Sequence, residues 1–141
     1  MRKQSGFSLL EVMVVLVIIG MIMAIVAPNI MGQQEEAAAD KARLDIQQLE
    51  DAMSMYKLRN KAYPSTEQGL EALVTASNID PVPKRFPDGG FIESLPEDPW
   101  GNPYQLLSPG ERGKFDILSM GPDGKIGTED DIGNWSDEEQ R

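Results

Sequence analysis

Apolar residues fill the stretch from Phe7 to Ala27 almost without interruption, and Glu11 is the one charged residue within it. About 20 residues of helix rise roughly 30 Å, which is the thickness of the hydrocarbon core of a bilayer. We therefore predict a hydrophobic helix over 7–27 that crosses a membrane. Arg2 and Lys3 precede this stretch, whereas the first cation after it is Lys41. The positive-inside rule then predicts a cytoplasmic N-terminus and an exported C-terminal part.

Beyond this stretch, apolar residues recur at spacings of four and three, which indicates one apolar face of a helix. This stripe consists of Ala42, Ile46, Leu49, Met53 and Tyr56. We predict that the first helix continues to about Lys57. Pro28 should kink it, because proline removes an interior hydrogen bond and clashes with the preceding turn. We interpret the stripe as the face that covers the core of a small domain, with a free coiled coil as the alternative.

The remaining segments predict one short helix and one β-hairpin. A proline and an N-cap signal at residues 63–66 precede a short predicted helix over 67–76, with Leu70, Leu73 and Val74 facing inward. Prolines and glycines crowd residues 78–103, which predicts an ordered loop. Strands are predicted at 104–108 and 114–120, joined by a glycine-containing turn. We therefore predict an α+β fold in which a small antiparallel sheet packs on the stripe of the first helix.

The segment from Gly121 to Ile132 is rich in glycine and contains four carboxylates. Ca²⁺ takes about six to eight oxygen ligands, and glycines let backbone carbonyls turn inward without steric cost. Two carboxylates 4 Å apart repel by roughly 4 kcal/mol at an effective dielectric constant of 20, and a divalent cation reverses that penalty. The spacing is not that of an EF-hand. The segment is a candidate calcium site, and a solvated acidic turn is the alternative.

Composition narrows the possible functions. The net charge of −10 disfavours binding to nucleic acid. The sequence contains neither cysteine nor histidine, which removes disulfides, thiol nucleophiles, the usual zinc sites and serine–histidine triads. Trp100 and Trp135 could serve as carbohydrate platforms, but we favour packing against the sheet and the acidic segment. With no catalytic constellation in the sequence, we predict that the protein is not an enzyme.

The small residue at the N-terminus has an unusual position. In a secretory signal peptide the small residue of the cleavage site follows a short apolar core, whereas here Gly6 precedes the apolar stretch. Cleavage after Gly6 would keep the hydrophobic helix on the mature chain and expose an α-amino group on Phe7. A carboxylate at the bilayer centre costs about 2.5 to 3.5 kcal/mol, so Glu11 needs a partner. The Phe7 amine of a neighbouring subunit could be that partner.

The sequence Gly-Phe-Ser-Leu-Leu-Glu at residues 6–11 closely resembles the class III leader of type IV pilins and type II secretion pseudopilins. In that family a prepilin peptidase cuts after the glycine and methylates the new N-terminus, and the glutamate is needed for filament assembly. The resemblance implies cleavage between Gly6 and Phe7, N-methylation of Phe7 and registration of subunits by Glu11. A simple signal anchor, whose Glu11 reaches the membrane interface, is the alternative interpretation.

A second resemblance spans nearly the whole chain. Residues 98–104, together with 121–124 and 130–132, resemble the major pseudopilins of type II secretion, the general secretion pathway protein G family. The resemblance implies a type IV pilin-like fold, with a long N-terminal helix packed against a small antiparallel C-terminal sheet. It also implies bound calcium. The implied ligands are the side chains of Asp123, Asp130 and Asp131 and the backbone carbonyls of Met120 and Lys125.

The resemblance also implies how the chain is organised and where it acts. Residues 1–6 would be a cleaved leader, 7–27 a transmembrane and assembly helix, and 28–141 a periplasmic globular domain that includes the C-terminal half of the first helix. The subunit would cross the inner membrane once, with its C-terminal domain in the periplasm, and would enter a periplasmic pseudopilus after assembly.

The implied function is that of the main structural subunit of the type II secretion pseudopilus, which polymerises to move folded proteins through an outer-membrane secretin. Its implied partners are further copies of the chain, minor pseudopilins, the prepilin peptidase and the inner-membrane assembly platform. Two alternatives stay open. One is the major subunit of a type IV pilus, and the other is a membrane-anchored, calcium-dependent binding module that does not polymerise.

Overall fold

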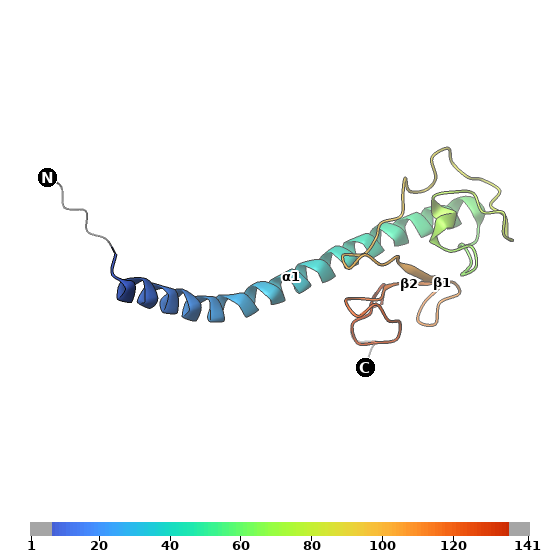
Figure 1. Ribbon diagram of the computed structural model, residues 1–141. Helices are drawn as coiled ribbons and strands as arrows, with labels where there is room; N and C mark the ends of the chain where they lie inside the picture. Colours follow the sequence, from blue (N-terminus) through green and yellow to red (C-terminus); the bar gives the residue numbers. More distant parts are fainter. Residues whose placement is uncertain (1–6, 136–141) are drawn as a thin grey trace. The chain divides into compact units, whose positions relative to one another are not determined.

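The computed structural model of the chain describes residues 7–135, with the backbone alone at residues 26–31. The chain forms two compact units, Met1–Ala37 and Ala38–Arg141. Helix α1 (Leu9–Asn60) contributes to both units. The remaining elements, coloured from green to red in Figure 1, are the 3₁₀ helix η1 (Leu70–Leu73) and the strands β1 (Gln105–Leu107), β2 (Asp116–Ser119) and β3 (Ile132–Gly133).

Helix α1 extends through the first unit and is continuous at Pro28. Proline therefore does not end the helix, and the kink expected there stays a prediction. The large apolar side chains from Phe7 to Ile25, at the start of α1 and just before it, are exposed. Over the described part of the chain, no helix was found to be both long enough and apolar enough to span a membrane.

The core of the second unit is built on the predicted stripe of α1. Each of its five side chains is at most 2% exposed: Ala42, Ile46, Leu49, Met53 and Tyr56. The hydrophobic cluster joins the stripe from Ile46 onward to Leu73 of η1 and to Leu106 and Ile117 of the sheet. Figure 1 shows β1 and β2 beside the C-terminal part of α1. The prediction that the stripe covers the core of a small domain is therefore confirmed.

The sheet has three antiparallel strands in the order β1-β2-β3. Leu106 pairs with Ile117 between the first two strands, and Ser119 pairs with Ile132 between the last two. The first two strands lie within the segments predicted at 104–108 and 114–120. Strand β3 was not predicted, because it has only two residues and one of them is a glycine.

The short helix predicted over 67–76 is wrong in its length, since only η1 (Leu70–Leu73) forms. Gly69 precedes η1 with a φ of 65°, which lies outside the helical region and sets the start of the element. At the other end, the carbonyl of Leu73 accepts a hydrogen bond from the N–H of Phe91 at 2.7 Å. Leu70 and Leu73 are buried as predicted, whereas Val74 is half-buried.

A polar contact ties the segment before β1 to α1. The Tyr104 hydroxyl donates a hydrogen bond to Oδ2 of Asp45 at 2.9 Å. Lys41 Nζ lies 2.6 Å from the same oxygen. Burial, this hydrogen bond and the negative charges of Asp45 and Asp98 together raise the pKa of Tyr104 well above its ordinary value.

The burial of Leu49 predicts a large effect of truncation. We expect Leu49→Ala to lower the free energy of unfolding by about 2 to 5 kcal/mol, because it leaves a cavity in the core. Leu49 is 0% exposed and Leu58 on the same helix is 86% exposed, so Leu58→Ala is the matched control, with a change within about 0.5 kcal/mol. Chemical denaturation of the full chain in detergent, followed by near-ultraviolet circular dichroism, measures the free energy of unfolding of both variants. Equal losses would contradict the assignment of the core face.

The raised pKa of Tyr104 predicts a loss of stability at high pH. The unfolded chain releases the phenol proton around the ordinary pKa of 10.0, whereas the folded chain keeps it to higher pH. The stabilisation is fully present below that pKa and is lost as the pH rises above it. We therefore expect the free energy of unfolding to fall more steeply above about pH 10 in the wild type than in Tyr104→Phe. Chemical denaturation across this range measures both, and parallel curves would refute the prediction.

Candidate functional site

The first candidate site is the N-terminal segment, of which Phe7 and Glu11 are described and Gly6 lies outside the described residues. Both described side chains are exposed. Together with Val12, Val15 and Leu16 they line a shallow hollow of about 260 Å³. Glu11 lies in the first turn of α1, where a negative charge interacts favourably with the helix dipole. The segment thus presents one carboxylate on an otherwise apolar, exposed helix surface.

Sequence reasoning missed the residue that starts this helix. The Ser8 hydroxyl accepts a hydrogen bond from the N–H of Glu11 at 3.1 Å, and the Ser8 carbonyl accepts one from the N–H of Val12 at 3.2 Å. Ser8 is therefore the N-cap of α1. The signal was visible in the sequence, because serine followed three residues later by glutamate is the signature of a capping box. Ser8 thus fixes the helical turn that carries Glu11.

The second candidate site is the acidic loop, defined here as residues 121–131, which connects the neighbouring strands β2 and β3. The pairing of Ser119 with Ile132 closes the base of the loop. Gly121 has a φ of 61°, and a Cβ there would collide with the carbonyl oxygen of Asp130. Only glycine fits this position, because the two ends of the loop touch through their backbones. The acidic loop therefore leaves the sheet and returns to it with its two ends in contact.

Two carboxylates of the acidic loop accept hydrogen bonds from backbone amides. Asp123 Oδ1 accepts a hydrogen bond from the N–H of Lys125 at 2.9 Å, and Asp131 Oδ2 accepts one from the N–H of Gly127 at 2.7 Å. Asp123 and Asp130 are exposed, and Asp131 is half-buried. The carbonyl of Lys125 accepts a hydrogen bond from the Thr128 hydroxyl at 3.3 Å. Met120 directly follows β2 and is half-buried.

The donor chemistry of the acidic loop suits Ca²⁺, because carboxylate and backbone carbonyl oxygens from one closed loop are the ligands that this ion takes. The side chains are not gathered around one point, however. Among the residues that the structure describes, no three acidic side chains lie in a group that could hold a metal ion. Asp123, Asp130 and Asp131 therefore share a loop, while two of them are turned toward backbone amides in this conformation.

A buried carboxylate lies beneath the start of the acidic loop. Asp98 is 4% exposed, and its Oδ1 accepts hydrogen bonds from the N–H groups of Trp100 at 3.1 Å and Asn102 at 2.7 Å. Its Oδ2 accepts a hydrogen bond from the Ser119 hydroxyl at 2.6 Å. The Ser119 oxygen in turn accepts one from the N–H of Gly121 at 3.2 Å. These contacts connect the turn at 98–102 to the acidic loop.

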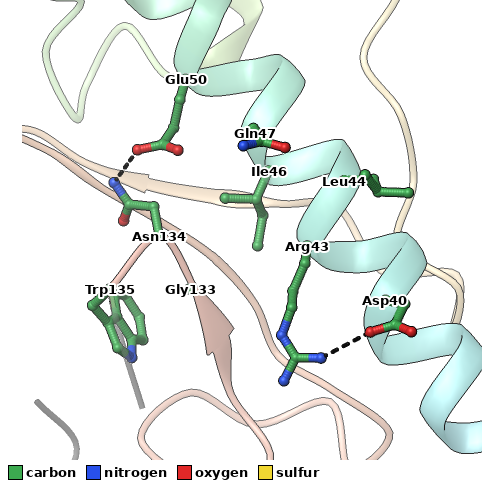
Figure 2. Close-up of a pocket in the computed structure, with 9 residues that line it drawn as sticks. All are labelled: Asp40, Arg43, Leu44, Ile46, Gln47, Glu50, Gly133, Asn134 and Trp135. Atoms are coloured by element: carbon green, nitrogen blue, oxygen red, sulfur yellow. Dashed lines mark hydrogen bonds and ion pairs between the residues drawn. The ribbon is translucent and has the colours of Figure 1, made fainter. Parts of the chain in front are cut away.

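Trp135 lines a groove of about 590 Å³ between α1 and the end of β3, shown in Figure 2. Asn134 bridges the two sides of this groove through a 3.1 Å hydrogen bond to Glu50. The ring of Trp135 lies against Gly133, and the Arg112 guanidinium lies 4.1 Å from the ring centroid. These contacts support the packing interpretation of Trp135 over the carbohydrate one.

Two family models match the chain, and their matched ranges together include both candidate sites. The model described as "Type II secretion system (T2SS), protein G" matches residues 29–135. The model described as "Prokaryotic N-terminal methylation motif" matches residues 1–27. The first covers the whole acidic loop, and the second covers Gly6, Phe7 and Glu11.

Curated relatives and a solved structure agree with these matches. The type II secretion system core protein G of Aeromonas hydrophila is 60% identical over 96% of this chain and 94% of its own length. The protein of the same description from Escherichia coli strain K12 is 56% identical over 94% of this chain and 92% of its own length.

The major pseudopilin from the type 2 secretion system of enterohaemorrhagic Escherichia coli has a similar structure. It superposes with a TM-score of 0.72 at 50% identity, over 77% of this chain and 95% of that chain. The predicted α+β fold of the type IV pilin kind is therefore confirmed. Family model, relatives and structure all point the same way, and the chain belongs to the type II secretion system protein G family.

Proposed function

We propose that this chain is the main structural subunit of a type II secretion pseudopilus, which polymerises in the periplasm and drives folded proteins through an outer-membrane secretin. The observation that carries the proposal is the union, in one chain, of the N-terminal methylation motif at residues 1–27 and the protein G domain at 29–135. The family match favours this function over the major subunit of a type IV pilus. The role is structural rather than catalytic.

The exposed N-terminal helix supports assembly. The apolar side chains from Phe7 to Ile25 are exposed in the isolated chain, and packing against neighbouring subunits would keep them out of water once the subunit leaves the lipid of the membrane. Glu11 is the one charge in this stretch. A carboxylate placed in apolar surroundings needs a cation. The α-amino group of Phe7 in a neighbouring subunit, freed by cleavage after Gly6 and then methylated, supplies it.

The same segment sets the location and the partners in this proposal. The prepilin peptidase processes the chain at Gly6 and Phe7, and residues 7–27 hold the subunit in the inner membrane in a single pass with its C-terminal domain in the periplasm. The inner-membrane assembly platform then adds it to a filament of further copies, beside minor pseudopilins. The cations before the apolar stretch and their absence directly after it support this orientation.

We expect Glu11→Ala to keep membrane insertion, because the variant removes a charged carboxylate from the apolar stretch. We expect it to abolish incorporation into filaments, because the proposed pairing that registers neighbouring subunits is lost. Glu35→Ala is the control, since Glu35 is exposed on the same helix outside the apolar stretch. Electron microscopy of sheared filaments from cells that express the whole secretion machinery measures assembly, and the mass of the mature N-terminus checks processing. Normal filaments of Glu11→Ala would contradict the proposed pairing.

We also propose that the acidic loop binds Ca²⁺ through Asp123, Asp130 and Asp131, with the backbone carbonyls of Met120 and Lys125. The oxygen donors and the closed backbone of the loop support the proposal. Two of the carboxylates accept hydrogen bonds from backbone N–H groups. Binding of Ca²⁺ would replace such hydrogen bonds with contacts between the carboxylates and the ion. Calcium, when bound, would offset the mutual repulsion of the carboxylates and hold the C-terminal segment to the sheet.

Calcium should therefore raise the stability of the folded chain. The gain equals RT ln(1 + [Ca]/Kd), which is about 2.7 kcal/mol when calcium exceeds Kd a hundredfold. Thermal unfolding of the full chain in detergent, in millimolar calcium and in chelator, measures the shift. Asp123→Ala should remove most of it, whereas Glu93→Ala, an exposed carboxylate outside the acidic loop, should keep it. An identical midpoint in calcium and chelator would reduce the acidic loop to a solvated turn.

A further inference from the structure

We propose that Asp98 and Ser119 are positioning residues of the acidic loop, and that they set its affinity for a divalent cation without touching the cation. The inference rests on the proposed calcium function for its affinity readout, and on the geometry of the described residues for its mechanism. Neither residue lies in the acidic loop itself.

Ser119 occupies the point at which the acidic loop leaves the sheet. Its backbone pairs with Ile132, so it closes the base of the loop. Its side chain is completely buried, at 0% exposure. The hydroxyl both donates to Asp98 and accepts from the N–H of Gly121, at 2.6 and 3.2 Å. The strand pairing and this hydroxyl therefore together hold the direction of the chain as it enters the acidic loop.

Asp98 holds Ser119 in that orientation. A hydroxyl that must accept from Gly121 needs an acceptor for its own hydrogen, and Asp98 Oδ2 is that acceptor. The other oxygen of Asp98 is fixed by the N–H groups of Trp100 and Asn102. The carboxylate is thus immobilised by its own turn before it orients Ser119. The chain of hydrogen bonds runs from a rigid turn, through Ser119, to Gly121.

The alignment at Gly121 matters because this residue packs directly on the far end of the acidic loop. A Cβ at Gly121 would collide with the Asp130 carbonyl oxygen, so a small displacement of Gly121 displaces Asp130 as well. Asn102, which Asp98 also fixes, lies beside Gly124, with its Nδ2 3.9 Å from the position a Cβ would take there. Asp98 therefore acts on the acidic loop through Ser119 and also fixes the backbone of the residue beside Gly124, and neither Gly121 nor Gly124 supplies a proposed ligand.

The decisive variant is Ser119→Ala in the full chain in detergent. It removes the hydroxyl and leaves the proposed ligands in place. Contacts that orient metal ligands are typically worth about 10- to 100-fold in metal affinity, so we expect calcium affinity, measured by calorimetry, to fall at least about tenfold. Asp98→Asn provides the second variant: it replaces the acceptor for the Ser119 hydroxyl with an amide, and should also weaken binding.

Asp116→Asn is the matched control. Asp116 is also a carboxylate at 4% exposure, and it also holds a turn by accepting two backbone N–H groups, those of Glu111 at 2.7 Å and Arg112 at 3.1 Å. Its turn belongs to the β1–β2 hairpin rather than to the acidic loop. A general loss of stability should follow from this variant as well, but its calcium affinity should stay within about twofold of the wild type. Wild-type affinity in Ser119→Ala would overturn the positioning role and leave the calcium proposal intact.

A metal-free measurement separates the two proposals. Without calcium, amide hydrogen exchange in residues 121–131 should be about tenfold faster in Ser119→Ala than in the wild type, and unchanged in Asp116→Asn. If the wild type binds no calcium, the calcium proposal fails and this exchange decides the positioning role. Unchanged exchange of the acidic loop in Ser119→Ala would then overturn it.

Discussion

The stripe of α1 from Ala42 to Tyr56 can leave water only by lying against the sheet and η1, and the second unit is arranged around this requirement. Full burial of a large apolar side chain is worth about 1.5 to 3 kcal/mol, so the stripe makes a large favourable contribution in a chain that has no cysteines to cross-link it. Polar contacts such as that of Tyr104 with Asp45 then fix how the sheet lies on the helix. The loops that carry the candidate chemistry are held by this packing.

The parts of the fold that sequence predicted are those with a repeating local signal. The four-and-three spacing of the stripe is set by the geometry of the helix itself, and its buried face follows directly. The elements that sequence missed or misjudged depend on distant contacts. Strand β3 forms by pairing with β2, and the side chain of Asn134, directly after it, accepts from the N–H of Ile117 and donates to Glu50. The helix expected over 67–76 shrinks because Gly69 starts it late and the Leu73 carbonyl turns to Phe91.

The candidate sites show the same division. Gly6, Phe7 and Glu11 form one local motif and could be recognised from residue order alone, and Ser8 could have been added from its spacing to Glu11. The acidic loop was visible as a concentration of carboxylates, but their hydrogen bonds to backbone amides were not. The contact of Asp98 with Ser119 was the hardest of these features to see in the sequence. The two residues are separated by 21 positions in the sequence and meet only because the turn at 98–102 lies beneath β2.

The pairing of Ser119 with Ile132 has a consequence for how this protein can vary. Because both ends of the acidic loop are fixed in adjacent strands, its exposed residues other than the proposed ligands can change in number and kind while the packing of α1 against the sheet stays the same. A new loop in this position costs little closure entropy, since each doubling of loop length adds only about 0.6 kcal/mol. The paired ends of β2 and β3 therefore allow different loops to evolve at this position while the rest of the domain keeps its packing.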